Sequence, residues 1–363
     1  MVSSNFLDVY KGKEVFVTGH TGFKGSWLTY ALCKAGAIVK GYSLAPATNP
    51  SLYTLFENEV NIESVIADIN DASKLQKEIL SFQPDFIFHL AAQPLVRRSY
   101  KEPLNTFGTN VMGTANLLNA VIHLTKPCSC ILITTDKVYE NKEWNYPYRE
   151  TDRLGGYDPY SASKACSELV INSYRNSFFN PAHYNQHQKS IVSVRAGNVI
   201  GGGDWSEDRL IPDIVRAIAF DKNIIIRSPN SVRPWQHVLE PVFGYLQLGV
   251  SLSQHPSKYE GAWNFGPSNA DNLPVIDIAQ QAIDIWGKGK IDLQIDPNAL
   301  HEAKLLKLDI SKAINELPWK PKMDTAMAIE RTIQWYKSFY NGEQTALQLL
   351  EADILYYQSL LNN

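Results

Sequence analysis

Residues 15–25 read Val-Phe-Val-Thr-Gly-His-Thr-Gly-Phe-Lys-Gly, and this stretch decides the fold. Its β-branched and aromatic start predicts a buried strand, and the amphipathic residues 26–34 that follow predict a helix. Between them lie Gly19, Gly22 and Gly25. Glycine permits a positive φ in a turn, and without a Cβ it lets backbone N–H groups at a helix N-terminus approach a phosphate. The stretch therefore predicts a strand, a turn and a helix that bind a dinucleotide.

Six strand-like segments alternate with helical patterns in the first half of the chain. Residues 86–88 and 131–133 are uninterrupted apolar runs, as expected where helices cover both faces of a sheet. This alternation predicts parallel βαβ units, and so an α/β fold with a Rossmann-type, doubly wound parallel sheet. The expected strands are 14–18, 37–42, 62–66, 85–90, 130–135 and 190–196, and the expected helices are 24–35, 71–82, 106–124 and 159–178.

The alternation loosens beyond about residue 197, where Gly201-Gly202-Gly203 and a proline-containing region at 227–241 follow. We therefore expect residues 1–197 to form the dinucleotide-binding domain. Residues 198–363 should form mainly a smaller lobe that binds substrate over the carboxyl edge of the sheet. Because strand-like segments near 224–227 and 262–265 fit either part, we expect the two to be interleaved.

Composition excludes several classes of protein. The chain has 363 residues, of which 44% are hydrophobic and 20% charged, and its net charge of −3 provides no basic field for nucleic acid. The four cysteines show neither the spacing of a metal site nor the density of a disulfide scaffold. We find no signal-peptide core and no apolar run long enough to span a membrane, and so expect a cytoplasmic protein without a metal.

Tyr160 and Lys164 form the second informative pattern, in the sequence Tyr-Ser-Ala-Ser-Lys. A spacing of four places both side chains on one face of a helix. A lysine ammonium beside a phenol favours the phenolate and lowers the tyrosine pKa from about 10 toward neutrality. Such a tyrosine is able to take a proton from a sugar hydroxyl while hydride leaves the same carbon. The alternative is an exposed helical pair, but the upstream glycine turn favours catalysis.

The third pattern is Thr135-Asp136-Lys137 at the carboxyl end of an apolar strand, which faces the ligand crevice in a doubly wound sheet. Thr135 is placed to hydrogen-bond the reacting hydroxyl together with Tyr160. Asp136 and Lys137 add an acid and a base, which indicates proton removal and a leaving group besides hydride transfer. A solvated Asp-Lys turn, or an ion pair between the two, is the alternative.

Together these motifs resemble those of the extended short-chain dehydrogenase/reductases, and within them the CDP-glucose 4,6-dehydratase family. The resemblance covers nearly the whole chain. The glycine and Tyr/Lys motifs indicate only the superfamily, whereas Phe-Lys-Gly, the Asp-Lys pair and Arg-Pro-Trp-Gln-His point to the branch that acts on CDP-sugars. The motifs are residues 19–27, His89-Leu90-Ala91-Ala92-Gln93, residues 135–141, Tyr160 with Lys164, residues 233–238 and Leu317-Pro318-Trp319-Lys320-Pro321.

The resemblance implies a reaction on CDP-glucose with NAD as a resident cofactor. Tyr160 would deprotonate the 4-hydroxyl as hydride leaves C4, and the 4-ketone would acidify the C5 proton. We expect Lys137 to remove that proton and Asp136 to protonate the departing 6-hydroxyl. Burial favours these roles, because it raises the pKa of an aspartate and lowers that of a lysine. The product would be a CDP-4-keto-6-deoxyglucose, made for deoxysugars of surface polysaccharide such as the O-antigen of lipopolysaccharide.

The resemblance also implies the cofactor contacts. The second strand ends in Gly41-Tyr42-Ser43 without the acidic residue that often binds the adenosine ribose, but residues 41–48 also lack an arginine for a 2′-phosphate. NAD is therefore favoured over NADP. The expected contacts are Gly19, Thr21, Gly22, Phe23 and Gly25 at the pyrophosphate, Asp68 and Ile69 at the adenine, and Leu90, Ala91, Ala92, Gln93, Thr109, Tyr160 and Lys164 along the remainder.

For the diphosphate of the substrate we nominate Arg209 and Arg233, because guanidinium groups suit phosphate oxygens. Surface arginines are the alternative for both. Asn198 resembles a family residue that contacts the sugar nucleotide. Trp235 packs either against ligand or only in the core. We interpret His237 as structural.

Other functions are compatible with some of these motifs. A nucleotide-sugar 4-epimerase or decarboxylase would use Tyr160 and NAD without needing Asp136 and Lys137, and a dehydratase could act on another nucleotide-hexose. A non-catalytic NAD-binding regulator would be expected to have lost Tyr160 or Lys164, and both are present. The family also implies a homodimer or homotetramer, paired through residues 106–124 and 159–178, although the apolar residues there suit packing on the sheet equally well.

Overall fold

The computed structural model describes residues 4–268, 273–295 and 305–362. Its centre is a seven-stranded sheet in the order β11-β6-β5-β4-β1-β2-β3, with every neighbouring pair parallel. The predicted α/β fold with a doubly wound parallel sheet is therefore confirmed. The strands are β1 (Glu14–Thr18), β2 (Ile38–Ser43), β3 (Ile62–Ile66), β4 (Phe86–His89), β5 (Cys128–Ile133), β6 (Lys189–Ala196) and β11 (Gly261–Phe265).

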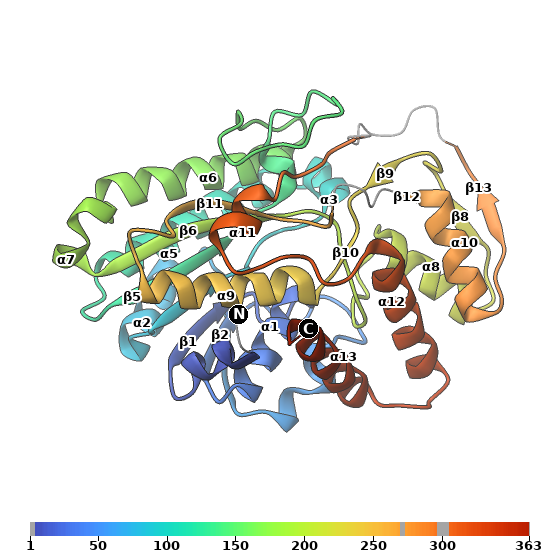
Figure 1. The fold of residues 1–363 in the computed structure, drawn as a ribbon, viewed down its shortest axis with the longest axis horizontal. Coiled ribbons are helices and arrows are strands. Elements are labelled where there is room, and N and C mark those ends of the chain that lie inside the picture. Colours follow the sequence, from blue (N-terminus) through green and yellow to red (C-terminus); the bar gives the residue numbers. More distant parts are fainter. Residues whose placement is uncertain (1–3, 269–272, 296–304, 363) are drawn as a thin grey trace.

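Helices cover both faces of the sheet (Figure 1). Successive strand residues alternate between the two cores: Val15 and Val17 pack in one, whereas Phe16 packs in the other. This period of two is the reason why the strands are apolar throughout. Helices α1 (Phe23–Lys34) and α9 (Leu239–Gln254) cover one face, and α2 (Ala72–Phe82), α5 (Gly113–Ile122) and α6 (Pro159–Ser177) cover the other.

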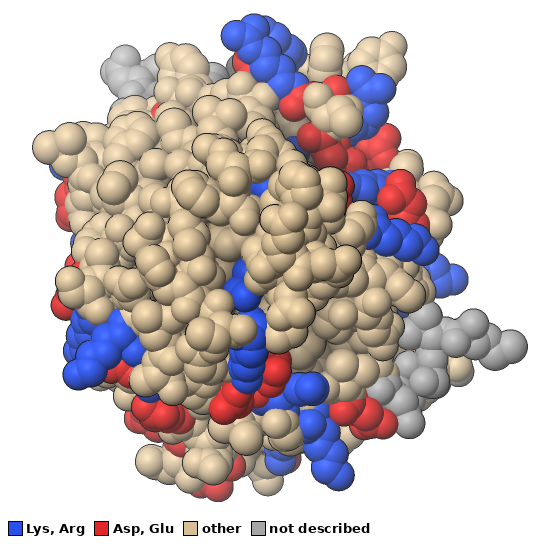
Figure 2. Space-filling view, turned by 90° about the vertical axis from the view of Figure 1, so that its left-hand side faces the viewer, with Lys and Arg blue, Asp and Glu red and all other residues tan. Residues whose placement is uncertain are grey.

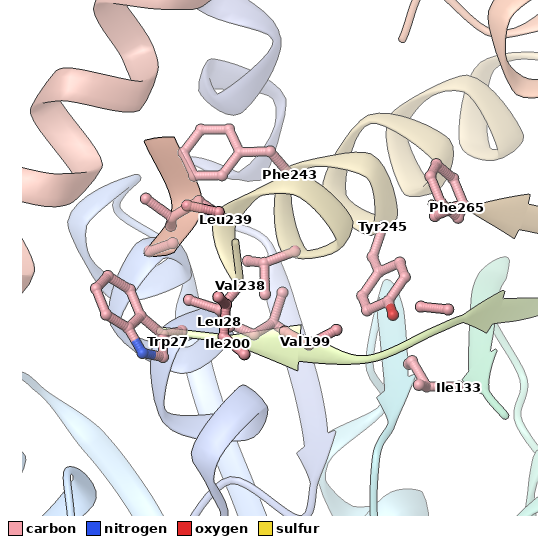
Figure 3. Close-up of a cluster of buried hydrophobic side chains, with 14 of the residues drawn as sticks. Trp27, Leu28, Ile133, Val199, Ile200, Val238, Leu239, Phe243, Tyr245 and Phe265 are labelled. Carbon is pink, nitrogen blue, oxygen red and sulfur yellow. The ribbon is translucent and has the colours of Figure 1, made fainter. Parts of the chain in front are cut away.

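The core between α1, α9 and the sheet joins distant parts of the chain (Figure 3). Trp27 of α1 is fully buried, and its indole N–H donates to the carbonyl of Gly202 at 3.0 Å. Val238 and Tyr245 of the α9 segment are also fully buried in this core. The C-terminal half is thereby fixed to the sheet at the level of the glycine turn.

The order of strands reverses direction between β1 and β4, which are neighbours in the sheet. In open α/β sheets the connections to either side of such a point leave in opposite directions, and a crevice opens at the carboxyl ends of the strands. The segments after β1, β4 and β5 are the glycine turn, residues 90–95 and the short helix η5 (Asp136–Val138). The predicted site residues therefore converge at one edge.

The helix expected over residues 106–124 is interrupted. It consists of α4 (Pro103–Phe107), a single π-helical turn η4 (Gly108–Met112) and α5. Asn110 in this turn is buried, and its side-chain amide bonds to the backbone of Gln93 and to Ser163 of α6. Such single turns often occur at functional sites, and nothing in the helical periodicity marks them.

The smaller lobe contains α8 (Leu210–Ala219), β8 (Ile224–Ile226), α10 (Val275–Trp286), β13 (Ile291–Leu293) and α12 (Thr325–Tyr340). Figure 1 shows these elements gathered at one end of the molecule. Of the two ambiguous strand segments, β8 pairs with β13 in this lobe, whereas β11 extends the main sheet beside β6. Of the short strands, β7 (Val199–Ile200) pairs with β10 (Gln236–His237), and β9 (Val232–Arg233) pairs with β12 (Leu273–Pro274).

The C-terminal helix α13 (Ala346–Leu361) bonds to helices α1, α9 and α12. Glu351 accepts a bond from the Tyr30 hydroxyl at 2.6 Å and pairs with Lys34, and Asp353 pairs with Arg331 of α12. Tyr357 donates to Glu240 of α9 at 2.7 Å. Glu240 is buried and also accepts two backbone N–H groups, yet burial raises its pKa to about 7.

Gly25→Ala should destabilise the protein strongly, because a Cβ at residue 25 would lie 1.9 Å from the carbonyl oxygen of Gly19. We expect a loss of about 3 kcal/mol in the free energy of unfolding, measured by urea denaturation. Gly22→Ala is the matched control, because the nearest atom to its Cβ would be 3.4 Å away and its backbone is extended. It should cost less than about 1 kcal/mol. Equal stability of the two variants would contradict the close packing of this turn.

Glu240→Gln should flatten the dependence of stability on pH. The pKa of Glu240 is raised in the folded state from 4.5 to about 7, so the folded protein holds the extra proton between these values. The resulting stability is complete below pH 4.5 and is lost as pH rises through about 7, by up to about 3 kcal/mol. Urea denaturation at pH 5.5 and 8.0 measures the difference, with Glu351→Gln as control, because the pKa of the half-buried Glu351 is lowered rather than raised. A wild-type slope in Glu240→Gln would contradict this account.

Candidate active site

The glycine turn leaves the N-terminus of α1 open. Gly19 has a φ of 76°, and Gly22 caps the helix without any side-chain hydrogen bond to its N–H groups. The Thr21 hydroxyl is turned away, toward Ser43 at 2.9 Å and the carbonyl of Leu44 at 2.8 Å. Open N–H groups at a helix N-terminus, with no Cβ over them, fit the pyrophosphate of a dinucleotide.

The end of β4 lies against this turn. Thr18 bonds to His89 at 2.7 Å and accepts the backbone N–H of Ala91 at 3.2 Å. A Cβ on Gly19 would lie 2.7 Å from the nitrogen of Ala91, so only glycine permits this approach. Leu90, Ala91 and Ala92 are half-buried along the edge.

Gln93 differs from its neighbours. Its side-chain amide donates to the Thr106 hydroxyl at 2.9 Å and to the carbonyl of Leu95. Both bonds go to protein atoms and hold the loop that follows β4. The adenine candidates lie farther along the edge: Asp68 is exposed and bonds to Asn70, whereas Ile69 is buried and packs against Gly113. The half-buried Thr109 lies in the π-helical turn.

The chemical centre is formed where β5 ends and α6 begins. Asp158 caps α6 by accepting the N–H of Ser161 at 2.9 Å, and Pro159 occupies the first turn. Tyr160 follows in this first turn and hydrogen-bonds to Thr135. The Thr135 hydroxyl also donates to Asp136 at 2.9 Å. Three of the predicted catalytic side chains therefore meet in one buried cluster.

Lys164 completes the cluster one turn along α6. It is buried, and its ammonium donates to the carbonyl of Ile133 at 3.2 Å. Burial and the charge of Lys24 lower the pKa of Lys164 to about 7. Burial raises the pKa of Tyr160 to about 12, although Thr135 opposes this shift. The direction differs from the expected lowering, because burial outweighs the opposing effects of Thr135 and of the Arg209 charge.

Asp136 is buried among cations. Burial raises its pKa, and the charges of Lys137, Arg233 and Lys24 oppose the rise. Its second oxygen lies near Gly197, where a Cβ would be 3.2 Å away. Among the described residues the Nζ of Lys137 forms no ion pair within 4.0 Å of this carboxyl group, although its charge is the strongest of those that oppose the rise in pKa.

The predicted substrate residues lie on the lobe side of this centre. Arg209 pairs with Asp204 at 3.7 Å, and its positive charge favours the deprotonated forms of both Tyr160 and Lys24. Arg233 donates to the carbonyl of Val232, and its positive charge favours the ionised form of Asp136. Both arginines are therefore brought to the site.

Asn198 and Trp235 are placed differently from the arginines. Asn198 is half-buried, and its carbonyl holds Gln236 of β10 at 3.0 Å. Trp235 is buried in the main core, with no protein partner for its indole N–H. A pocket opens beside them, lined by Gly197, Pro234, Gly266, Pro267, Ser268, Lys307 and Leu308.

Lys24 and Asn110 are two residues of this neighbourhood that sequence reasoning did not nominate. Lys24 lies in the first turn of α1, and its charge acts on Asp136 and Lys164. A cation at a helix N-terminus opposes the helix dipole, and this anomaly was the available signal. No such signal existed for Asn110, because its role depends on the π-helical turn. No cluster of potential metal ligands, and no helix able to span a membrane, occurs within the described part of the chain.

Known proteins resemble this chain in sequence. The family model described as GDP-mannose 4,6 dehydratase matches residues 16–332. A CDP-glucose 4,6-dehydratase of Salmonella typhimurium is 49% identical over 343 residues, which cover 94% of this chain and 95% of that protein. A dTDP-glucose 4,6-dehydratase of Streptomyces antibioticus is 29% identical, over 89% of this chain and 92% of its own. The predicted resemblance is thus confirmed.

The fold is shared with solved structures. A UDP-glucuronic acid 4-epimerase of Bacillus cereus, in complex with UDP-glucuronic acid and NAD, is 25% identical, with a TM-score of 0.76 over 90% of this chain and 100% of its own. A dTDP-glucose 4,6-dehydratase of Bacillus anthracis, in complex with NAD, has a TM-score of 0.72 at 21% identity over 90% of this chain and 97% of its own. With the matched family model and the glycine turn, these findings lead to one conclusion: this chain belongs to the GDP-mannose 4,6 dehydratase family.

Proposed function

We propose that this chain converts CDP-glucose to CDP-4-keto-6-deoxyglucose and water. The observation that carries the proposal is the buried Asp136, which lies next to Lys137 and is bonded through Thr135 to Tyr160. An acid and a further amine beside the Tyr/Lys pair provide for elimination as well as oxidation. The 49% identity to a CDP-glucose 4,6-dehydratase supports the choice of substrate.

Tyr160, Thr135 and Lys164 serve the oxidation. Thr135 holds the 4-hydroxyl of the sugar, and the phenolate of Tyr160 accepts its proton as the 4-ketone forms. The Lys164 ammonium favours the phenolate. NAD bound at the glycine turn would accept the hydride from C4 and return it at C6.

Lys137 and Asp136 serve the elimination. The 4-ketone acidifies C5–H, and Lys137 takes that proton as the base. Asp136 gives a proton to the 6-hydroxyl, which leaves as water while a C5–C6 double bond forms. After the hydride has reached C6, Lys137 delivers a proton to C5, and this proton comes from solvent because the ammonium exchanges its hydrogens with water. Burial favours this role, because it raises the pKa of the Asp136 carboxyl group.

The remaining cations suit the nucleotide diphosphate. Arg209, Arg233 and Lys24 act on the buried centre from the lobe and from α1. Guanidinium forks bind phosphate oxygens in pairs, and a bound diphosphate would balance the charge that these groups gather. We therefore assign Arg209 and Arg233 to the diphosphate and leave Trp235 as a core residue.

We further propose that the protein is a homodimer paired through α6 and the α4–α5 segment. Leu169 of α6 and Phe178 at its end are exposed, as are Leu104 and Met112 of the α4–η4 segment. Figure 2 shows that the end of the molecule with α7 (Tyr184–His187) and the end of α6 carries few charged side chains. Exposed apolar surface of this kind is typical of an interface between subunits.

Incubation of the purified protein with NAD and CDP-glucose should yield a 4-keto sugar, detected by its absorbance in alkali. We expect at least tenfold higher kcat/KM for CDP-glucose than for dTDP-, GDP- or UDP-glucose. Formation of CDP-galactose without a 4-keto product would instead identify a 4-epimerase, and no conversion of any nucleotide sugar would contradict an enzymatic function.

Lys137→Ala should reduce turnover by 10²- to 10⁴-fold, the usual contribution of a general base. Oxidation at C4 does not need Lys137, so substrate should still produce the absorbance of reduced nicotinamide near 340 nm. Lys142→Ala is the matched control, because Lys142 is an exposed lysine of the following loop that pairs with Glu140. Wild-type turnover by Lys137→Ala would remove Lys137 from the mechanism.

A further inference from the structure

A buried carboxylate lies one helical turn beyond Lys164, and the proposed chemistry does not use it. Glu168 of α6 and Arg195 of β6 form an ion pair at 2.8 Å, and each side chain is only 4% exposed. Moving two charges out of water is costly unless their remaining hydrogen bonds are also satisfied. Glu168 meets this condition, because it also accepts the hydroxyls of Thr134 and Ser193.

The bonds of Glu168 connect the two elements that form the chemical centre. Thr134 belongs to the end of β5 and directly precedes Thr135. One carboxylate oxygen therefore holds the strand end, while the other holds Ser193 and Arg195 of β6. Because Glu168 and Lys164 are successive on one face of α6, the same contacts fix the position of Lys164 along the strand end.

Arg195 extends the network away from the site. It donates to the Tyr139 hydroxyl at 2.9 Å and to the carbonyl of Glu150 at 3.0 Å. Tyr139 in turn donates to Asn264 of β11 at 2.8 Å, and the backbone N–H of Asn264 donates to the Glu150 carboxylate at 2.9 Å. Arg195 is therefore held in place from the side opposite α6.

The charges around Lys164 come from four elements. Lys24 of α1 opposes its protonation, and Glu168 favours it. His89 of β4 also faces Lys164, and burial with the lysine charge lowers the pKa of His89 to about 3, so this ring stays neutral. Tyr160 shares the helix, and Arg195 of β6 is paired with Glu168. Glu168 is thus the carboxylate that supports the ammonium of Lys164.

We propose that Glu168 is a positioning residue: it holds α6 against the ends of β5 and β6, and its negative charge favours the protonated form of Lys164 beside Tyr160. This inference rests on the proposed roles of Tyr160 and Lys164. The effect of the Glu168 charge is nevertheless measurable through the chemical reactivity of Lys164 itself, without any turnover.

Glu168→Gln removes the charge but keeps an oxygen for Thr134. Lys164 should then lose its proton more readily, so its modification by an amine reagent at pH 7, followed by peptide mass spectrometry, should be severalfold faster than in the wild type. The alkaline limb of the pH profile of kcat should move about one unit lower, the usual size of a single charge interaction. KM for CDP-glucose should change less than threefold, because Glu168 touches no substrate.

Glu150→Gln is the matched control, because it removes a carboxylate from the same network at a point remote from Lys164. It should leave both the modification rate and the alkaline limb unchanged. Glu168→Asp keeps the charge and should restore the limb. If Glu168→Gln folds but has wild-type modification and a wild-type pH profile, the residue is merely structural and the proposal is overturned.

Thr134→Val separately tests whether Glu168 positions α6 against the end of β5. This variant remains informative if Glu168→Gln fails to fold. It removes one donor to Glu168 without a change of charge, so kcat should fall about tenfold while the alkaline limb stays in place. A wild-type kcat in a folded Thr134→Val variant would overturn the positioning role. Changed Lys164 reactivity with no turnover of any nucleotide sugar would support this inference and contradict the proposed function instead.

Discussion

The structure depends on the close packing of the first turn of α6 against the end of β5. Tyr160 and Lys164 have no chemistry of their own as a helical pair, and they become a site only because Thr135 and Asp136 are held against them out of water. Two further sets of contacts stabilise this packing. Glu168 of α6 pairs with Arg195 of β6, and Asn110 bonds to Ser163 of α6.

The same burial creates an electrostatic problem. Lys24, Lys137 and Arg233 act on Asp136, whereas Glu168 is paired with Arg195 and acts on Lys164. Removal from water raises the pKa of Asp136 and lowers that of Lys164 to about 7, which eases proton exchange by both groups. The excess of positive charge matches two anionic ligands, a dinucleotide at the glycine turn and a nucleotide diphosphate from the lobe.

Local pattern was sufficient to predict much of this arrangement. The glycine turn, six strands of the sheet and the convergence of Thr135, Asp136 and Tyr160 follow from periodicity and from the rule that parallel strands end at one edge. The π-helical turn at Asn110, the pairing of β11 with β6 and the Glu168–Arg195 pair do not, because each depends on contacts between segments far apart in the sequence. The pKa of Tyr160 shifted in the unexpected direction for the same reason, since burial is a property of the folded chain.

The central claim is that one hydrogen leaves C4 of a sugar and returns two carbons away on the same molecule. CDP-glucose that carries deuterium at C4 tests it most directly, by NMR and mass spectrometry of the product. The account predicts that the deuterium is retained and appears in the C6 methyl group, with one solvent hydrogen at C5. Deuterium lost to water, or still attached to C4 of the product, would contradict it.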